Sequence, residues 1–158
     1  MARTLKRLLC ALAAAAACQT ASAHPALWIS DDDGTLGIVS LASGTVSIVG
    51  QMRIIMTDIA FDTSGQLWGV SAASGLYRID RETAAVSLVG ALGQRVNSLV
   101  FDDRGTLYAA NDALMTIDLA TGAATLVGAG GGYSSSGDLA FVDGQLYLSS
   151  ALPTPDTL

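Results

Sequence analysis

Few residues of this 158-residue chain could carry chemistry, and most of them are aspartates. His24 is the only histidine, so any Ser-His-Asp or Cys-His mechanism would depend on it alone. A copper site built on His24 as a mature N-terminus would normally need a second histidine. The run Asp31-Asp32-Asp33-Gly34 lacks the alternating spacing and the final glutamate of an EF-hand loop, which favours a solvent-exposed hairpin turn. The sequence therefore predicts no catalytic residue and no metal ligand.

A second group of polar residues recurs at one place in the sequence pattern. Thr57-Asp58, Asn97-Ser98 and Gly137-Asp138 each end a loop and precede an apolar segment. The longest of these loops, 128–137, is rich in Gly and Ser and carries Tyr133. Binding residues concentrate on loops that a rigid scaffold positions. We therefore predict a binding site whose residues are Asp58, Asn97, Tyr133 and Asp138.

The segments around these loops repeat with a period of forty residues. Asp58-Ile-Ala-Phe61 recurs as Ser98-Leu-Val-Phe101 and as Asp138-Leu-Ala-Phe141, at steps of 98 − 58 = 40 and 138 − 98 = 40. Two further markers keep the same order, namely Leu-Trp or Leu-Tyr (27, 67, 107, 146) and Ile/Leu-Val-Gly (48–50, 88–90, 126–128). Repeats of this length are typical of propellers, solenoids and arrays.

Each repeat reads as four short strands with turns between them. In the second repeat the predicted strands are 58–62, 66–71, 76–80 and 85–89, rich in apolar residues and bounded by turn residues. Four antiparallel strands per forty residues predict one blade of a β-propeller, so the predicted fold class is all-β. Between the third and fourth strands, Gly44 and Gly122 suit a left-handed turn position. Ala84 stands there in the second repeat, which predicts a strained or different turn.

An aromatic residue recurs in the second strand of every repeat, as Trp28, Trp68, Tyr108 and Tyr147. No blade can bury both of its faces alone, so neighbouring blades must cover them. The aromatic stripe is most simply the packing between blades.

The amino-acid sequences of the repeats resemble those of a known group of proteins. Leu76-Tyr-Arg-Ile-Asp80 with Ser87-Leu-Val-Gly90, and Met115-Thr-Ile-Asp118 with Thr125-Leu-Val-Gly128, are similar to the blades of uncharacterised bacterial exported β-propellers. Those blades commonly read LYxIDxxTGxxTLVG and are grouped with quinoprotein amine dehydrogenase β-chain-like and NHL/YVTN-type propellers. The resemblance covers nearly all of 26–150. It implies a blade fold and no particular activity.

The number of repeats is too small for an ordinary ring. The predicted blades lie near 26–57, 58–97, 98–137 and 138–150, the first lacking its first strand and the last having only two, about three and a quarter in all. A tail without ordered structure is predicted at 151–158. Propellers usually close with four to eight blades. The chain is therefore a piece of a longer propeller, half of an oligomeric ring, or an open arc with exposed strand edges.

The first 23 residues have the pattern of a secretory signal peptide. A basic start and the apolar run 8–17 precede Ala21-Ser22-Ala23, a cleavage signal of the A-x-A type. Both cysteines, Cys10 and Cys18, lie in this segment, so the mature chain would have neither a disulfide nor a thiol. A lipoprotein signal with an acylated Cys18 is the alternative. We expect an exported protein, periplasmic or extracellular, without a membrane span.

The net charge disfavours one class of partner. After cleavage five arginines, no lysine and all fourteen acidic residues remain, which gives 5 − 14 = −9. Nucleic-acid binding depends on clustered Lys and Arg, so nucleic acid is disfavoured.

Three functional interpretations remain open. The first is a binding or scaffolding module, without a predicted cofactor, that holds a protein or small molecule at loops near the mouth of the propeller channel. The second is a propeller enzyme (lyase, lactonase or quinoprotein-type) in which Asp58, Asn97 and Asp138 bind calcium. The third is a truncated fragment without function.

Overall fold

A computed structural model describes residues 26–129 and 131–152. The predicted signal peptide with its N-terminal helix, His24, both cysteines and residues 153–158 of the predicted tail lie outside the described residues. None of the described residues belongs to a helix with the length and apolar character needed to cross a bilayer.

The described chain consists of antiparallel strands in four sheets, as predicted. Blade 1 has three strands, blades 2 and 3 have four each, and blade 4 has two. In chain order, the strands are β1 (Ala26–Ser30), β2 (Thr35–Ser40) and β3 (Val46–Gln51) of blade 1, β4 (Met56–Phe61), β5 (Leu67–Ser71), β6 (Gly75–Ile79) and β7 (Val86–Ala91) of blade 2, β8 (Ser98–Phe101), β9 (Leu107–Ala110), β10 (Ala113–Ile117) and β11 (Ala124–Ala129) of blade 3, and β12 (Ser135–Val142) and β13 (Gln145–Ser150) of blade 4.

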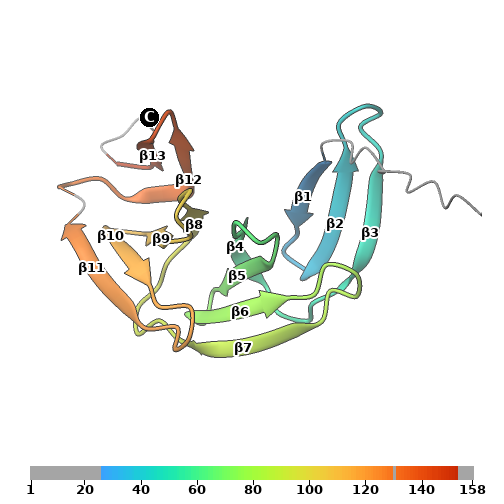
Figure 1. Cartoon of the computed structure of the whole chain (residues 1–158), viewed down its shortest axis with the longest axis horizontal. Helices are drawn as coiled ribbons and strands as arrows, with labels where there is room; N and C mark the ends of the chain where they lie inside the picture. The colour runs from blue at the N-terminus through green and yellow to red at the C-terminus, as the bar shows by residue number, and fades with distance from the viewer. Residues whose placement is uncertain (1–25, 130, 153–158) are drawn as a thin grey trace, which may run out of the picture.

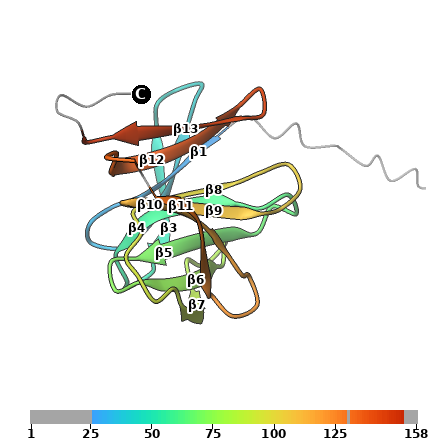
Figure 2. The same cartoon turned by 90° about the vertical axis from the view of Figure 1, so that its left-hand side faces the viewer.

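The four blades follow one another around an open arc (Figure 1). The first strands of blades 2, 3 and 4 lie nearest its centre, where β8 contacts both β4 and β12. Viewed from the side, β12 and β13 lie at one end of the molecule and β6 and β7 at the other (Figure 2). The sheets therefore surround an axis, as blades do, instead of stacking as two layers.

Adjacent blades pack through the predicted aromatic stripe. Trp28 of blade 1 meets Phe61 of blade 2 edge-on, with ring centroids 5.5 Å apart. Trp68 meets Phe101 at 6.3 Å, and Tyr108 meets Phe141 at 5.6 Å. Tyr147, in the last blade, is 47% exposed. The stripe is thus packing between blades wherever a following blade exists.

A second contact between blades explains the glycine that ends each Ile/Leu-Val-Gly marker. A Cβ on Gly90 would overlap the carbonyl oxygen of Thr121, in the third-to-fourth strand turn of blade 3. A Cβ on Gly50 would lie 2.7 Å from the carbonyl oxygen of Thr83 in blade 2. Because each glycine has no side chain, the turn of the following blade can pack directly against its backbone. Gly128 has nothing within 4 Å of its Cβ position.

The strands of blade 2 lie within two residues of the predicted ranges, and glycines occupy left-handed positions in the turns. Gly65, Gly105 and Gly144 have φ of 82°, 83° and 76° between the first and second strands. Ala84 adopts φ 60° where Gly44 and Gly122 have 69° and 77°, so the predicted strain is present. The run Asp31–Gly34 forms the expected hairpin turn between β1 and β2, in which the three aspartates are exposed and Gly34 is buried.

Candidate functional site

The structure places Asp58 and Asp138 on first strands, β4 and β12, near the axis of the arc. One carboxylate oxygen of Asp58 accepts a hydrogen bond from the backbone N–H of Ile59 at 2.7 Å, and the other accepts one from Leu99 on β8 at 2.6 Å. Asp58 therefore ties the first strand of blade 2 to that of blade 3. Asp138 is exposed.

Asn97 also joins neighbouring blades, in this case blades 3 and 4. Its side-chain Nδ2 donates to the carbonyl oxygen of Ser135 in blade 4 at 2.9 Å. Thr57 holds the same repeat position, and its hydroxyl donates to the carbonyl oxygen of Val96 at 3.1 Å. The Oδ1 of Asn97 is buried and has no hydrogen-bond partner among the described residues. These contacts make Asn97 a link between blades 3 and 4.

Burial dominates the electrostatics of Asp58. Loss of solvent raises its pKa to about 6, and the negative charge of Asp138 adds to this effect. The two backbone N–H groups act in the opposite direction because they favour the carboxylate. Asp58 thus titrates well above an ordinary aspartate.

The hydrogen bonds at the axis join neighbouring blades. Both oxygens of Asp58 accept backbone N–H groups, and the Nδ2 of Asn97 donates to the carbonyl oxygen of Ser135. Nowhere in the described part of the chain do three or more His, Cys, Asp or Glu side chains gather in a way that could hold a metal ion.

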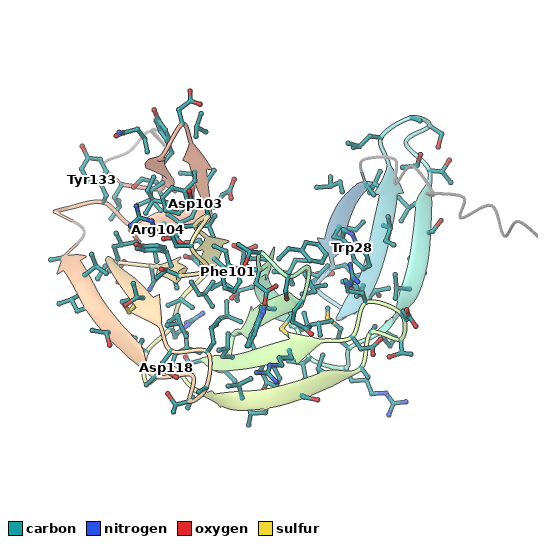
Figure 3. All side chains as sticks on the ribbon, viewed as in Figure 1. Trp28, Phe101, Asp103, Arg104, Asp118 and Tyr133 are labelled. Carbon is teal, nitrogen blue, oxygen red and sulfur yellow. The ribbon has the colours of Figure 1, made fainter. Side chains whose placement is uncertain are left out.

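Tyr133 lies apart from this group, beside an apolar pocket between blades 3 and 4. The pocket has a volume of about 150 Å³. Tyr133, 51% exposed, comes from the segment between β11 and β12 (Figure 3). The other residues lining it come from the β9–β10 hairpin and from blade 4, namely Ala110, Asn111, Ala113, Leu114, Leu139, Leu146 and Leu148. We call this hollow the Tyr133 pocket.

The pocket exists because the loop before β12 carries no Leu, Met or Val, and its one large side chain, Tyr133, remains half exposed. At the junction of blades 2 and 3, Leu76 is fully buried beneath Leu92 and Val96, which are 4% and 3% exposed. At the junction of blades 1 and 2, Leu36 is fully buried together with Met52 and Met56, forty residues earlier. Between Gly128 and Asp138 the third junction carries only Ala, Gly, Ser and Tyr133, with no residue like Leu92 or Val96. Leu114, the counterpart of Leu76, is consequently left partly exposed.

Asn111 lines the Tyr133 pocket, and polar contacts involve the residues that follow Asn111 and Tyr133 in the chain. The Ser134 hydroxyl donates to the Asp112 carboxylate at 2.6 Å, and the Ser134 backbone N–H donates to the Ser150 hydroxyl at 3.1 Å. An apolar pocket with a few polar groups at its edge is the usual form of a ligand site. Of the four predicted binding residues the structure places only Tyr133 here. Comparison of segment 129–137 with segments 51–57 and 91–97, which contain Met or Leu and Val, would have shown from the sequence that this junction lacks filling side chains.

No protein-family model matches the sequence, and no curated protein matches it. Several solved structures do. A protein from work on the de novo evolutionary emergence of a symmetrical protein is 21% identical, with a TM-score of 0.51 over 68% of this chain and 56% of its own. YCF48 bound to D1 peptide is 14% identical, with a TM-score of 0.54 over 82% of this chain and 45% of its own. BamB from Moraxella catarrhalis is 14% identical, with a TM-score of 0.51 over 80% of this chain and 39% of its own.

This chain thus spans roughly half the length, or less, of each of these proteins. YCF48 and BamB are β-propellers. The forty-residue repeat, the sheets of three, four, four and two strands around one axis, and these structural neighbours together identify the chain as a β-propeller-type repeat protein of about three and a quarter blades.

Proposed function

We propose that this propeller segment is a binding module for a partner polypeptide, and that the Tyr133 pocket takes one apolar side chain of that partner. The observation that carries the proposal is the unfilled third junction, where the other two junctions are filled by methionine, leucine and valine side chains. An apolar cavity of about this size binds benzene in another protein, so a phenylalanine or leucine side chain is a suitable occupant.

The surroundings of the pocket favour a polypeptide over a small polar ligand. Leu114, Leu139 and Leu148 offer only apolar surface, while Asn111, Asp112 and Ser134 at the edge could bond to a peptide backbone. Single buried side chains often dominate the affinity of protein interfaces. The structurally similar YCF48 was solved with a peptide, which is consistent with peptide recognition on this fold.

Nuclear magnetic resonance with capped amino acids tests the proposal. N-acetyl-phenylalaninamide and N-acetyl-leucinamide should shift the amide signals of residues 110–114, 133 and 146–148, whereas N-acetyl-lysinamide should not. Ala113→Leu, which fills the pocket, should abolish the shifts. Ala73→Leu, in the exposed β5–β6 hairpin of blade 2, is the matched control and should leave them unchanged. Equal shifts with the lysine probe, or none with any probe, would contradict the proposal.

We further propose that the protein acts after export, because residues 1–23 have the composition of a signal peptide and the remainder is strongly acidic. Expression in a bacterium followed by N-terminal sequencing should give His24 as the first residue. An acylated Cys18 at the N-terminus would instead support lipid anchoring, and an intact Met1 would argue against export.

A further inference from the structure

We propose a second binding site, which takes a guanidinium group, at a hollow between the first turns of blades 3 and 4. The hollow has a volume of about 410 Å³. It is lined by the β8–β9 turn, by one aromatic ring from each blade and by the β12–β13 turn, namely Asp102, Asp103, Arg104, Tyr108, Phe141 and Gly144. We call it the Tyr108 hollow. It shares no lining residue with the Tyr133 pocket, so the two proposals are independent.

In blade 2 the aromatic ring at the repeat position of Tyr108 already carries a guanidinium group. Trp68 pairs directly with Arg78 between β5 and β6, and the guanidinium carbon of Arg78 lies over the indole ring, 5.0 Å from its centroid. A cation in this place is attracted by the negative face of the ring. The indole N–H of Trp68 donates to Oδ2 of Asp62, in the β4–β5 turn, at 2.9 Å. The ring and the turn aspartate of blade 2 therefore both have partners within the blade.

Blade 3 keeps the ring and the aspartate but has neither partner. Tyr108 pairs with Thr116, and among the described residues no arginine or lysine lies over the Tyr108 ring. Only Oδ1 of Asp102 accepts hydrogen bonds from described residues, namely from the backbone N–H groups of Arg104 and Thr106. Both differences are substitutions between two complete four-stranded blades, Tyr for Trp and Thr for Arg. They leave one face of a ring and one carboxylate oxygen to an external partner.

The charges around the Tyr108 hollow favour a cation as that partner. Asp102 and Asp103 contribute two carboxylates and Arg104 one guanidinium group, and Asp103 and Arg104 are both exposed (Figure 3). A bound guanidinium group can stack on Tyr108, as Arg78 does on Trp68, while it donates to Oδ2 of Asp102. Guanidinium suits this pair of contacts better than ammonium because it is planar and presents several N–H donors in one plane. Arg104 carries a like charge and opposes the binding of a lone cation.

Titration with capped amino acids at constant ionic strength, followed by nuclear magnetic resonance, tests the inference. N-acetyl-argininamide should give saturable shifts of the amide signals of residues 102–104, 108, 141 and 144, with a dissociation constant on the order of millimolar. N-acetyl-citrullinamide has a similar shape without the charge and should bind at least about tenfold more weakly. Equal binding of these two probes, or no saturable shift up to about 50 mM of the arginine probe, would overturn the inference.

Free L-arginine distinguishes the two sources of such a group. Tighter binding of L-arginine than of N-acetyl-argininamide, lost in Arg104→Ser, would identify a free amino acid whose carboxylate pairs with Arg104. Equal or weaker binding of L-arginine would identify an arginine side chain of a partner polypeptide. In that case Arg104→Ser, which copies Ser64 of blade 2, should tighten the binding of N-acetyl-argininamide about two- to fivefold, because it removes a like charge.

A variant that copies blade 2 supplies the matched comparison. Thr116→Arg should place the chain's own guanidinium group over Tyr108, as Arg78 lies over Trp68, and should weaken binding of the arginine probe at least about tenfold. Ser47→Arg adds the same charge at an exposed position of β3 and should leave binding unchanged. Binding that Thr116→Arg leaves intact would contradict the site. Ala113→Leu should not affect this binding, so failure here and failure of the Tyr133 pocket are separate results.

Discussion

Among single residues, the turn aspartates and Asp58 respond to pH in opposite ways. Asp80 and Asp118 hold equivalent turn positions, and each carboxylate accepts two backbone N–H groups at 2.8–2.9 Å. The hydrogen bonds from the backbone N–H groups of Glu82 and Thr83 lower the pKa of Asp80. Those from Ala120 and Thr121 lower the pKa of Asp118 in the same way. Their contribution to stability is therefore present above the ordinary aspartate pKa and is lost as pH falls through the lowered value.

Asp58 gives the first prediction. Its folded pKa of about 6 exceeds the ordinary 3.8, so the folded state binds more protons than the unfolded state between these values. Stability from this group is therefore full below about pH 4 and lost as pH rises to about 6, on the order of 2 kcal/mol. Asp58→Ser, which copies Ser98, should flatten the profile of melting temperature between pH 4 and 6. An unchanged slope would show that Asp58 does not titrate there.

Calcium provides a second measurement at this scale. Under the enzyme alternative, in which Asp58, Asn97 and Asp138 bind calcium, millimolar calcium should raise the melting temperature, and Asp138→Asn should remove that rise. No shift with calcium would argue against a calcium site at the axis.

Ala84 gives a third prediction. Its φ of 60° costs a residue with a Cβ about 1 kcal/mol, but its methyl group is fully buried, and removing it loses about as much. Ala84→Gly should therefore change the free energy of unfolding by less than about 1 kcal/mol. The neighbouring Ala85 is exposed and its φ is not positive, so Ala85→Gly should destabilise. Denaturant titration of both variants makes the comparison, and a clear loss for Ala84→Gly alone would contradict it.

Between elements, the contact of Gly90 with the following blade gives the fourth prediction. Ala at Gly90 would force the Thr121 turn of blade 3 away from β7, at a cost of about 2–3 kcal/mol. Gly128 has the same repeat position but no neighbouring turn, so Gly128→Ala should be neutral or slightly stabilising. Chemical denaturation of the two variants isolates the contact between blades. Equal effects would mean that the glycine matters for the strand and not for the junction.

The sequence predicted the strands well because their spacing is set locally, by apolar segments between turn residues. Phe61, Phe101 and Phe141 recur at forty residues and all lie on first strands. The sequence was a poorer guide to the roles of Asp58 and Asn97, which it predicted as binding residues. A polar residue before a strand gives the same sequence pattern whether it binds a ligand or forms a hydrogen bond to the next blade. Only the distances to Leu99 and Ser135 showed the links between blades. The Tyr133 pocket arises because two of the three loops between blades carry Met, Leu or Val and the third carries none of them. This difference is visible only when the repeats are compared with one another.

At the scale of the whole molecule, the exposed strand edge at the end of the arc favours self-association. β13 pairs only with β12 among the described residues, and Tyr147 beside this edge is 47% exposed. Open strand edges with exposed apolar side chains favour pairing with other chains. Residues 24–158 should therefore show a mass above the monomer by light scattering, and the mass should rise with concentration. Tyr147→Lys should lower it. A monomer at all concentrations would contradict self-association and favour an open arc that is stable alone.

The fit between Thr121 and Gly90 has an evolutionary consequence. Each full blade carries both halves of this contact, a protruding turn on one side and a glycine on the other, so a duplicated blade brings its own matching surfaces. A gene that gains or loses forty residues by unequal recombination would keep every junction intact. A change in blade number therefore requires no compensating substitution at these contacts, and a copy of residues 58–97 inserted after Asn97 would bring both matching surfaces with it.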